Sequence, residues 1–538
     1  MEANMSMTQV ELWKQKFNQM ASDRATFNAQ WDEVAKVVCP DAARFSSEFN
    51  TPGERRNQEL YDSTGVHANE LLASGFYSLL TSPSQRWFEL LTNDDDVNAD
   101  REVELWLREV SNRMYAEMSR PTTGFITAVH EVYHSLGAFG NGILFVTESD
   151  DLKSLRFVSL PLQECYFAES AGTRVDTLYR KYKRTAAQLV RTFGIDAVSD
   201  HTRELYEKNN NQEKIDVLHI IEPKQDSREY QSCYIEYELG HILSKGRFEE
   251  CPFMCPRFYK TSYEVYGRGP GSSALPDLKM LQQIAKTTIK GAQKVVDPPL
   301  MIPDQGFIGD IRTMPGGISY FRSGLSKEDR IIPLQTGGNP GLGVDLSQDI
   351  RARVREMFYI DQLQLNNGPQ MTATEVIQRT EERMRLLGPV TGRAQAELLG
   401  PCVIRTFGLL SRAGRLPDPP EIMMDPSVKL RVVYQSPMMK AQEQTEANGL
   451  LRVTQLVAPF MSIDPSVMDV FNPEAIARGV GHMYSLNPNF FRSEEEVQAI
   501  RQQRAEQQQQ QQMVEMLNQG GAGIKDLAQG MEAMGGMQ

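Results

Sequence analysis

The sequence has 538 residues, of which 40% are hydrophobic and 24% charged, a composition typical of a globular protein with roughly two to four domains. Its formal net charge of −13 argues against a protein that binds nucleic acid over its whole surface, so any contact with DNA must come from a local basic face. No segment reaches the roughly 18 apolar residues of a membrane helix, and Met1–Met20 is too polar for a secretory signal. We therefore expect no membrane partner.

Before residue 140 apolar residues recur at helical spacing, and between Gly142 and Lys260 the spacing shortens toward two. The predicted helices cover Val10–Phe17, Phe27–Val38, 62–80, Val103–Met118 and Gly124–Leu136, with a short extended segment at 86–90. The predicted strands cover Ile143–Thr147, Leu155–Ser159, Glu164–Ala168, Thr177–Tyr182, Val217–Glu222, Cys233–Glu238 and Phe253–Tyr259. We expect an α+β chain that is predominantly helical, with residues 1–271 as its α/β body.

The His130-Glu131-x-x-His134 sequence matches a zinc-protease motif on a predicted helix. The third ligand position of the longer signature is Gly140, and the helix has an ordinary apolar face. The six cysteines lack the paired spacing of a zinc ribbon. We expect no metal, cofactor or catalytic residues, and keep a zinc metallohydrolase at His130 and His134 as the alternative.

A glycine-rich segment, Tyr266–Ser273, separates the body from the next predicted helix. It lacks the preceding strand and the following Lys-Ser/Thr that a nucleotide-binding loop needs, so we expect a flexible hinge. The helix after it, residues 272–296, carries a packing face and a basic face. The packing face consists of Leu278, Leu281, Ala285, Thr288, Ala292 and Val295, and the basic face of Lys279, Lys286, Lys290 and Lys294. A solvated helix face and a polyanion-binding surface both fit this pattern.

Residues 297–345 are rich in Gly and Pro but retain short apolar segments, which predicts a small extended module. A second helix, 346–362, follows. Its predicted packing face is Leu346, Ile350, Val354 and Phe358, and its polar side carries Arg351 and Arg355.

A polar, uncharged loop then interrupts the helical pattern at 363–371. It contains Gln364, Asn366, Asn367 and Gln370, and the helix restarts at a capping box formed by Thr372 and Glu375. Such a loop can touch phosphates without the counterion-release affinity that would trap DNA. We expect a long bent helix and a return strand over 372–438, helices over 439–518 and a disordered tail over 519–538.

Several motifs occur in a characteristic order along the chain. They are Leu60-Tyr-Asp-Ser-Thr-Gly65, Leu72-Ala-Ser-Gly-Phe76, Thr81-Ser-Pro-Ser84 with Trp87-Phe88, Gly137-Ala-Phe-Gly-Asn-Gly142 and Met371-Thr-Ala-Thr-Glu-Val376. Together they resemble the head-to-tail connector, or portal, proteins of T7-like short-tailed phages over nearly the whole chain. That family is structural, so the resemblance implies no active site.

The resemblance implies a division of the chain into named regions. Residues 1–271 and 372–438 resemble the wing, 272–296 and 346–362 the paired stem helices, 297–345 the clip, 363–371 the tunnel loop and 439–518 the crown. The DNA-channel candidates are Lys286, Lys290, Lys294, Arg351, Arg355, Gln364, Asn366, Asn367 and Gln370.

The resemblance also implies the partners. Portal proteins of this kind form rings of twelve subunits at one capsid vertex of the virion and are assembled in the host cytoplasm. Double-stranded DNA passes through the ring without sequence specificity, the terminase large subunit and later the tail adaptor bind the clip, and capsid and scaffolding proteins surround it. A non-viral helical oligomeric scaffold is the remaining alternative, and a closed ring with an axial hole would distinguish the two.

Overall fold

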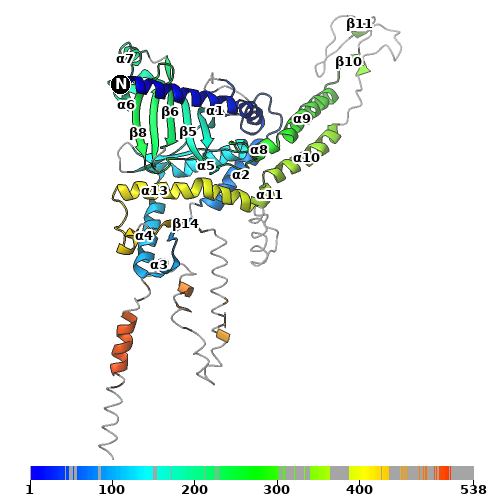
Figure 1. The fold of residues 1–538 in the computed structure, drawn as a ribbon. Coiled ribbons are helices and arrows are strands. Elements are labelled where there is room, and N and C mark those ends of the chain that lie inside the picture. The colour runs from blue at the N-terminus through cyan, green and yellow to red at the C-terminus, as the bar shows by residue number, and fades with distance from the viewer. Residues whose placement is uncertain are drawn as a thin grey trace, which may run out of the picture. The chain divides into compact units, whose positions relative to one another are not determined.

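The computed structural model describes most of the chain up to residue 435 and parts of the remainder (Figure 1). The described residues are 2–42, 44–47, 53, 57–82, 86–149, 154–170, 172–210, 213–224, 227, 229–301, 307–308, 320–321, 332–333, 340–363, 387–425, 427–435 and short stretches between 449 and 509. Contacts divide the chain into two compact units. One comprises Met1–Glu89 with Val110–Pro417, and the other comprises Leu90–Glu109 with Asp418–Gln538.

The larger unit is built around a five-stranded antiparallel sheet with the strand order β4-β5-β6-β7-β8. Its strands are β4 (Cys165–Glu169), β5 (Val175–Thr185), β6 (Lys214–Pro223), β7 (Tyr230–Glu236) and β8 (His241–Phe248). A second sheet has the order β3-β2-β9, with β2 (Leu144–Glu148), β3 (Leu155–Ser159) and β9 (Phe253–Met254). Strands β2, β3 and β4 alternate buried and more exposed residues, as expected for antiparallel sheets, whereas β6 is buried on both faces.

Helix α1 (Glu2–Val38) covers one face of the five-stranded sheet (Figure 1). Its side chains Val10, Trp13 and Phe17 pack in one cluster with apolar residues of β5, β6 and β7. On another part of the sheet, α6 (Ala186–Phe193) contributes Leu189 to a second cluster, which also contains Val198 from the loop before α7 (Asp200–Glu207). Both short helices begin at side-chain N-caps, Thr185 and Ser199, which satisfy amide groups of the first turn.

The glycine-rich segment before the stem is a close-packed junction with the loop after α5 (Phe125–Phe139), so the predicted flexible hinge is wrong. Gly140 has φ +79°, and a Cβ atom there would lie 2.4 Å from the backbone nitrogen of Gly269. Asn141 fastens the contact, because its Oδ1 accepts a hydrogen bond of 2.7 Å from the Gly267 amide and its Nδ2 donates to the Gly267 carbonyl. Glycine is needed here because two backbones touch.

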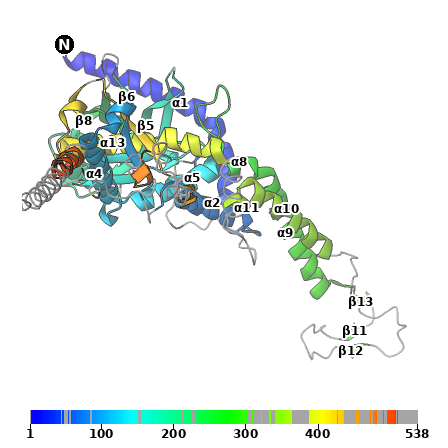
Figure 2. The ribbon, with the colours of Figure 1, turned by 90° about the horizontal axis from the view of Figure 1, so that it is seen from below.

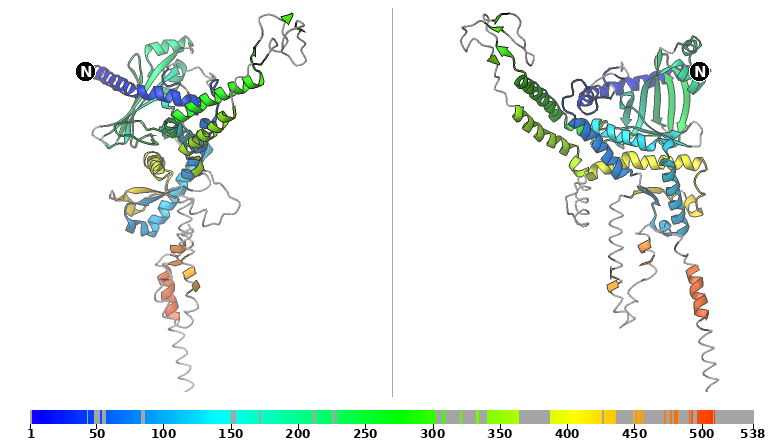
Figure 3. Two further views of the ribbon diagram at one scale, coloured as in Figure 1. Left: turned by 90° about the vertical axis from the view of Figure 1, so that its right-hand side faces the viewer. Right: turned by 180° about the vertical axis from the view of Figure 1, so that it is seen from behind.

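Helices α9 (Leu275–Val296) and α10 (Pro340–Met357) form an antiparallel pair that we call the stem hairpin (Figures 1 and 3). Figure 2 shows α8 (Pro270–Ser273), which precedes α9, and α11 (Ile360–Leu363), which follows α10, at the same end of the hairpin. Between the two helices, β10 (Leu300–Met301) pairs with β13 (Ile332–Pro333), and β11 (Phe307–Ile308) pairs with β12 (Tyr320–Phe321). Helix α10 begins earlier than the predicted start at residue 346.

The long helix predicted after the tunnel loop is described from residue 387 to residue 412. Residues Gln395–Leu399 are a π-helical turn, closed by a hydrogen bond from the Gly400 amide to the Gln395 carbonyl, and α13 (Gly400–Arg412) continues the helix. This widened turn lies just before Pro401, which has no amide hydrogen to donate to the helix.

The smaller unit contains α3 (Asp95–Ala99), the first part of α4 (Arg101–Met118) and most of β1 (Phe88–Thr92), which pairs with β14 (Leu430–Tyr434). Within the predicted crown, 439–518, the structure describes short helical stretches such as 496–507, and the predicted tail, 519–538, lies outside the described residues. The prediction of a chain with mixed helix and sheet is confirmed. The division into wing, stem, clip, tunnel loop and crown stays a prediction.

Candidate nucleic-acid interface

Hydrogen bonds join the stem hairpin to the loop before α2 (Thr64–Leu80). The Gln282 side chain of α9 accepts hydrogen bonds from the amides of Tyr61 (2.7 Å) and Asp62 (3.0 Å), and it donates one to the Asp62 carbonyl (2.6 Å). From α10, Arg351 donates to the Asp62 carboxylate through Nε (2.9 Å) and Nη2 (2.8 Å). Burial alone would raise the pKa of Asp62, but hydrogen bonds from Thr64 and Arg351 and the charge of Arg351 lower it. These contacts set the direction in which the hairpin leaves the body.

The two helices of the hairpin also contact each other closely. Arg353 of α10 lies 3.3 Å from Asp277 of α9 in an ion pair. A Cβ atom at Gly343 would lie 2.2 Å from the Thr288 hydroxyl of α9, so a glycine is required where the helices approach. The pairing of the two predicted stem helices thus has a specific side-chain basis.

The predicted packing faces are buried only in part. Leu278, Leu281, Ile350, Val354 and Phe358 are fully buried. By contrast, Val295 is 57% exposed and Leu346 is 48% exposed, so their assignment to the packing faces is wrong within a single subunit. Ser347, next to Leu346, is buried instead. Its hydroxyl donates a hydrogen bond of 2.7 Å to the Gly343 carbonyl. Other exposed apolar residues of the hairpin are Met280, Ile289, Val296, Leu342, Val344 and Met357.

The predicted basic residues differ in their surroundings. Lys290 and Lys294 are exposed, and within the described part of the chain neither is paired with a carboxylate. The Lys286 ammonium lies 5.4 Å from the centre of the Tyr61 ring, beside a cavity of about 840 Å³. Arg355 lines a second cavity of about 470 Å³ with His67 and Ile360. These four residues are accessible to a ligand.

Arg351 has a structural role, because its guanidinium is held by Asp62. The remaining predicted site residues, Gln364, Asn366, Asn367, Gln370, Thr372 and Glu375, lie outside the described residues. Sequence reasoning missed Asp62 and Gln282 as partners of the stem. Asp62 belongs to the Leu60–Gly65 motif, which was a usable signal, whereas nothing in the sequence singled out Gln282.

The residues of the zinc-protease motif lie on α5 and contact α2 and the residue that follows α1. His130 Nε2 is 3.5 Å from the Ser74 hydroxyl, and His134 Nδ1 is 3.9 Å from the Cys39 sulfur. Burial and the nearby His130 lower the pKa of His134. Among the residues that the structure describes, no group of three or more His, Cys, Asp or Glu side chains is arranged to hold a metal ion.

Comparison with known proteins decides the family. Residues 11–491 match the family described as "Bacteriophage head to tail connecting protein". The chain belongs to this family. It is 32% identical to the "Probable portal protein" of Bordetella phage BPP-1 over 533 residues, which cover 95% of this chain and 94% of that protein. The resemblance to phage portal proteins is confirmed.

Other portal proteins are similar over most of their length. The "Portal protein" of Salmonella phage epsilon15 is 29% identical over 542 residues, covering 98% of this chain and 96% of that protein. The "Portal protein" of Escherichia phage T7 is 22% identical over 444 residues, covering 77% of each chain. The portal family is structural rather than enzymatic.

Two solved structures are similar at low identity. A chain from the "Neck of native GTA particle computed with C12 symmetry" is 10% identical, with a TM-score of 0.34 and coverage of 72% of this chain and 85% of that one. A chain from the "Virion of native gene transfer agent (GTA) particle" is also 10% identical, with a TM-score of 0.33 and coverage of 82% and 96%.

Proposed function

We propose that twelve copies of this portal protein form a ring at one capsid vertex and that double-stranded DNA passes through the ring during packaging and ejection. The observation that carries the proposal is the stem hairpin, which exposes apolar and basic side chains together. Leu342 is 71% exposed and Val296 85% exposed on a hairpin that a single subunit does not cover. An exposed apolar surface of this kind is typical of a subunit interface.

The charge of the hairpin supports contact with a polyanion. Lys286, Lys290 and Lys294 recur along one side of α9, so a ring of hairpins would present repeated rows of ammonium groups. The chain as a whole has a net charge of −13, which would limit nonspecific adhesion of DNA elsewhere on the ring. A small number of lysines on an otherwise acidic ring would attract the DNA phosphates only weakly, so the duplex could move through the ring without staying bound.

The further partners follow from membership in the portal family. We propose that the clip, residues 297–345, binds the terminase large subunit during packaging and the tail adaptor afterward. The tunnel loop, 363–371, would contact the moving DNA through Gln364, Asn366, Asn367 and Gln370. Capsid and scaffolding proteins would surround the ring, which would be assembled in the host cytoplasm and retained in the virion.

Neutralising the three lysines tests the DNA role. The variant K286Q/K290Q/K294Q should form rings of unchanged mass by native mass spectrometry but retain less DNA in particles. The matched control K208Q/K214Q/K245Q removes three exposed lysines, which lie just after α7, on β6 and on β8, and should leave DNA content unchanged. If the stem variant fails to form rings while its subunits stay folded, the lysines belong to the subunit interface and the channel assignment is wrong.

A further inference from the structure

The short segment Arg257–Tyr259 contacts both flanks of the stretch that contains the predicted tunnel loop. The described chain reaches Leu363 at the end of α11 and resumes at residue 387 in the long helix. Residues 364–386 between these points lie outside the described residues. The two flanks are separated along the chain, yet each contacts a side chain of the same segment.

The first flank is held through Tyr359, between α10 and α11. Tyr359 has φ +57°, a left-handed conformation that is unfavourable for a bulky residue and persists only where its surroundings enforce it. Its hydroxyl contacts the hydroxyl of Tyr259, and its ring centre lies 6.3 Å from that of Phe258. Leu363 packs against α2, where a Cβ atom at Gly75 would lie 2.8 Å from its Cδ1.

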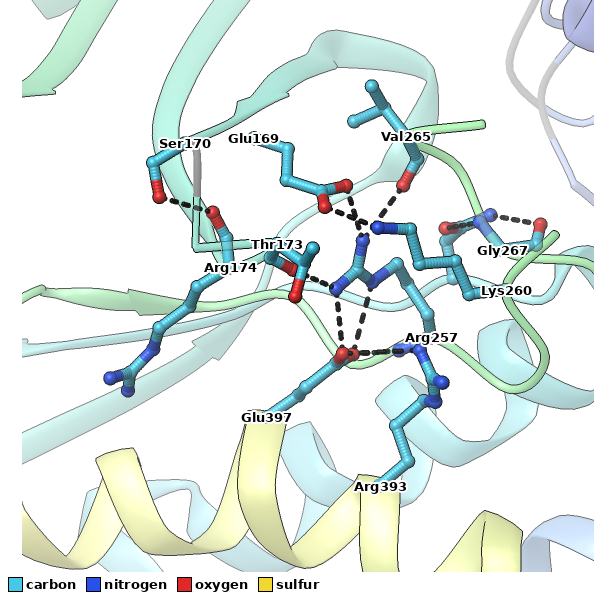
Figure 4. A network of polar contacts seen from close by, with 11 residues as sticks. Glu169, Ser170, Thr173, Arg174, Arg257, Lys260, Val265, Gly267, Arg393 and Glu397 are labelled. Carbon is cyan, nitrogen blue, oxygen red and sulfur yellow. Dashed lines mark hydrogen bonds and ion pairs between the residues drawn. The ribbon is translucent and has the colours of Figure 1, made fainter. Parts of the chain in front are cut away.

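The second flank is held through Glu397 in the π-helical turn. The Glu397 carboxylate accepts hydrogen bonds from the Arg257 amide (2.9 Å), from Arg257 Nε (3.2 Å) and from Arg257 Nη2 (2.7 Å), as Figure 4 shows. A π-helical turn shifts the side chains after it relative to a regular helix, and such turns often occur at functional sites. Both flanks therefore have unusual backbone geometry at the residue that contacts the segment.

The segment itself is fixed within the body. The Arg257 side chain is 2% exposed. It also donates a hydrogen bond of 2.9 Å to the Glu169 carboxylate and one of 2.8 Å to the Thr173 carbonyl, at the turn between β4 and β5 (Figure 4). Phe258 is buried and its amide donates to the Gly140 carbonyl, while Tyr259 exchanges two backbone hydrogen bonds with Arg268. Burial alone would raise the pKa of Glu169, but Lys260 and Arg257 lower it, so Glu169 stays charged at neutral pH.

We propose that Arg257 and Tyr259 are positioning residues that hold α11 and the π-helical turn, the described flanks of the predicted tunnel loop, in register and couple a displacement of one flank to the other. The tunnel-loop role rests on the function proposed above, whereas the coupling is a property of the subunit. Arg257 extends the coupling to the β4–β5 turn through Glu169 and Thr173. A displacement of the π-helical turn would thereby reach the five-stranded sheet.

Hydrogen–deuterium exchange on the assembled full-length protein, without DNA, tests the coupling. E397Q removes the charge that holds Arg257 on the second flank, and amides of Ile360–Leu363 on the first flank should exchange roughly ten-fold faster. The matched control is E250Q, which breaks the ion pairs of Arg405 and Arg412 on the same long helix. The control should leave exchange at Ile360–Leu363 unchanged.

A second variant tests the coupling in the opposite direction. Y359F keeps the aromatic side-chain ring and removes the hydroxyl that contacts Tyr259. Amides of Gln395–Leu399 should then exchange faster. The proposal would be overturned if exchange became faster only beside the mutated residue. It would also be overturned if E250Q accelerated exchange at the far flank as much as the test variants do. If E397Q does not fold, Y359F decides alone.

The same variants separate the coupling from the proposed function. Faster exchange at the far flank, combined with a normal DNA content in particles that carry E397Q, would establish the coupling and contradict the role of the loop in DNA passage. Unchanged exchange would overturn the coupling and leave the conduit proposal to the lysine experiment.

Discussion

Arg351 of α10 donates two hydrogen bonds, of 2.9 and 2.8 Å, to a single oxygen of Asp62, which lies two residues before the start of α2. The two residues are 289 positions apart, and their ion pair joins the returning stem helix to the body. Asp62 is buried, so its carboxylate depends on these donors.

Replacing the buried carboxylate should weaken the subunit. D62N leaves the Arg351 guanidinium without a charged acceptor, and we expect the free energy of unfolding to fall by about 1–3 kcal/mol. Urea denaturation of the subunit measures the change. The control E204Q removes the exposed pair with Lys208 and should leave stability essentially unchanged. Equal effects of the two variants would show that the Asp62–Arg351 pair contributes no more to the free energy of unfolding than an exposed ion pair does.

The contribution of Asp62 should depend on pH in a defined direction. Its pKa is lowered in the folded chain, so the stabilisation is fully present above the unfolded pKa of about 3.9 and is lost as the pH falls through the folded value. The stability difference between the wild type and D62N should therefore be constant from pH 7 to about pH 5 and shrink below about pH 4. A difference that grows on acidification would contradict this assignment.

The close approach of the stem helices predicts a strong effect at Gly343. G343V places branched carbon atoms against Thr288, and we expect a loss of about 1–3 kcal/mol in unfolding free energy, partly recovered in G343A/T288A. On α9, a Cβ atom at Gly291 would have no neighbour within 4 Å, so G291A should be neutral or stabilising by up to about 1 kcal/mol. An unchanged free energy of unfolding in G343V would mean that α9 and α10 lie further apart than the structure places them.

The exposed apolar residues of the hairpin should act in assembly and not in folding. L342Q/L346Q should leave the melting temperature of the isolated subunit within about 2 °C of the wild type, because neither side chain is buried. The fraction of protein in rings, measured by size-exclusion chromatography with light scattering, should fall. The control L239Q changes a residue 57% exposed on the turn after β7 and should assemble normally. Normal assembly of the double variant would contradict the assigned interface.

The contact between α1 and the sheet depends on Glu222. Its carboxylate accepts from Trp13 Nε1 (2.9 Å), Lys16 (3.0 Å) and the Tyr179 hydroxyl (3.0 Å). E222A leaves the buried Trp13 and Tyr179 donors without this acceptor and should cost about 2–4 kcal/mol, measured by denaturation with tryptophan fluorescence. K16Q removes only the half-exposed partner and should cost less than about 1 kcal/mol. The reverse order would contradict this account.

The periodicity of the sequence predicted the elements whose faces are cleanly apolar. Leu155–Ser159 has the predicted bounds, and α5 extends the predicted Gly124–Leu136 by one turn. Strand β8 was missed because it contains Ser244, Lys245 and Gly246 and lies at the edge of the sheet, where polar residues are tolerated. Helices α6 and α7 were missed because they are short, although Thr185 and Gln188 form a capping box that was visible in the sequence.

The candidate site was predictable only in part. A repeat of about 100° per residue placed the lysines of α9 on one side, because helix geometry is local. The same reasoning assigned Leu346 to the core, and the structure buries Ser347 in its place, because packing against α9 sets the rotation of α10. The partners of Arg351 and Arg257 come from distant parts of the chain, and only the folded structure brings them together.

Negative-stain electron microscopy of the purified chain is the first experiment that we would make on the proposed assembly of this portal protein into a closed ring that conducts DNA. Class averages viewed along the symmetry axis should show a closed ring of about twelve lobes with a central hole. Such rings should be less abundant in preparations of L342Q/L346Q. Uniform monomers or dimers of the wild-type chain, under conditions in which the subunit is folded, would contradict the proposed assembly.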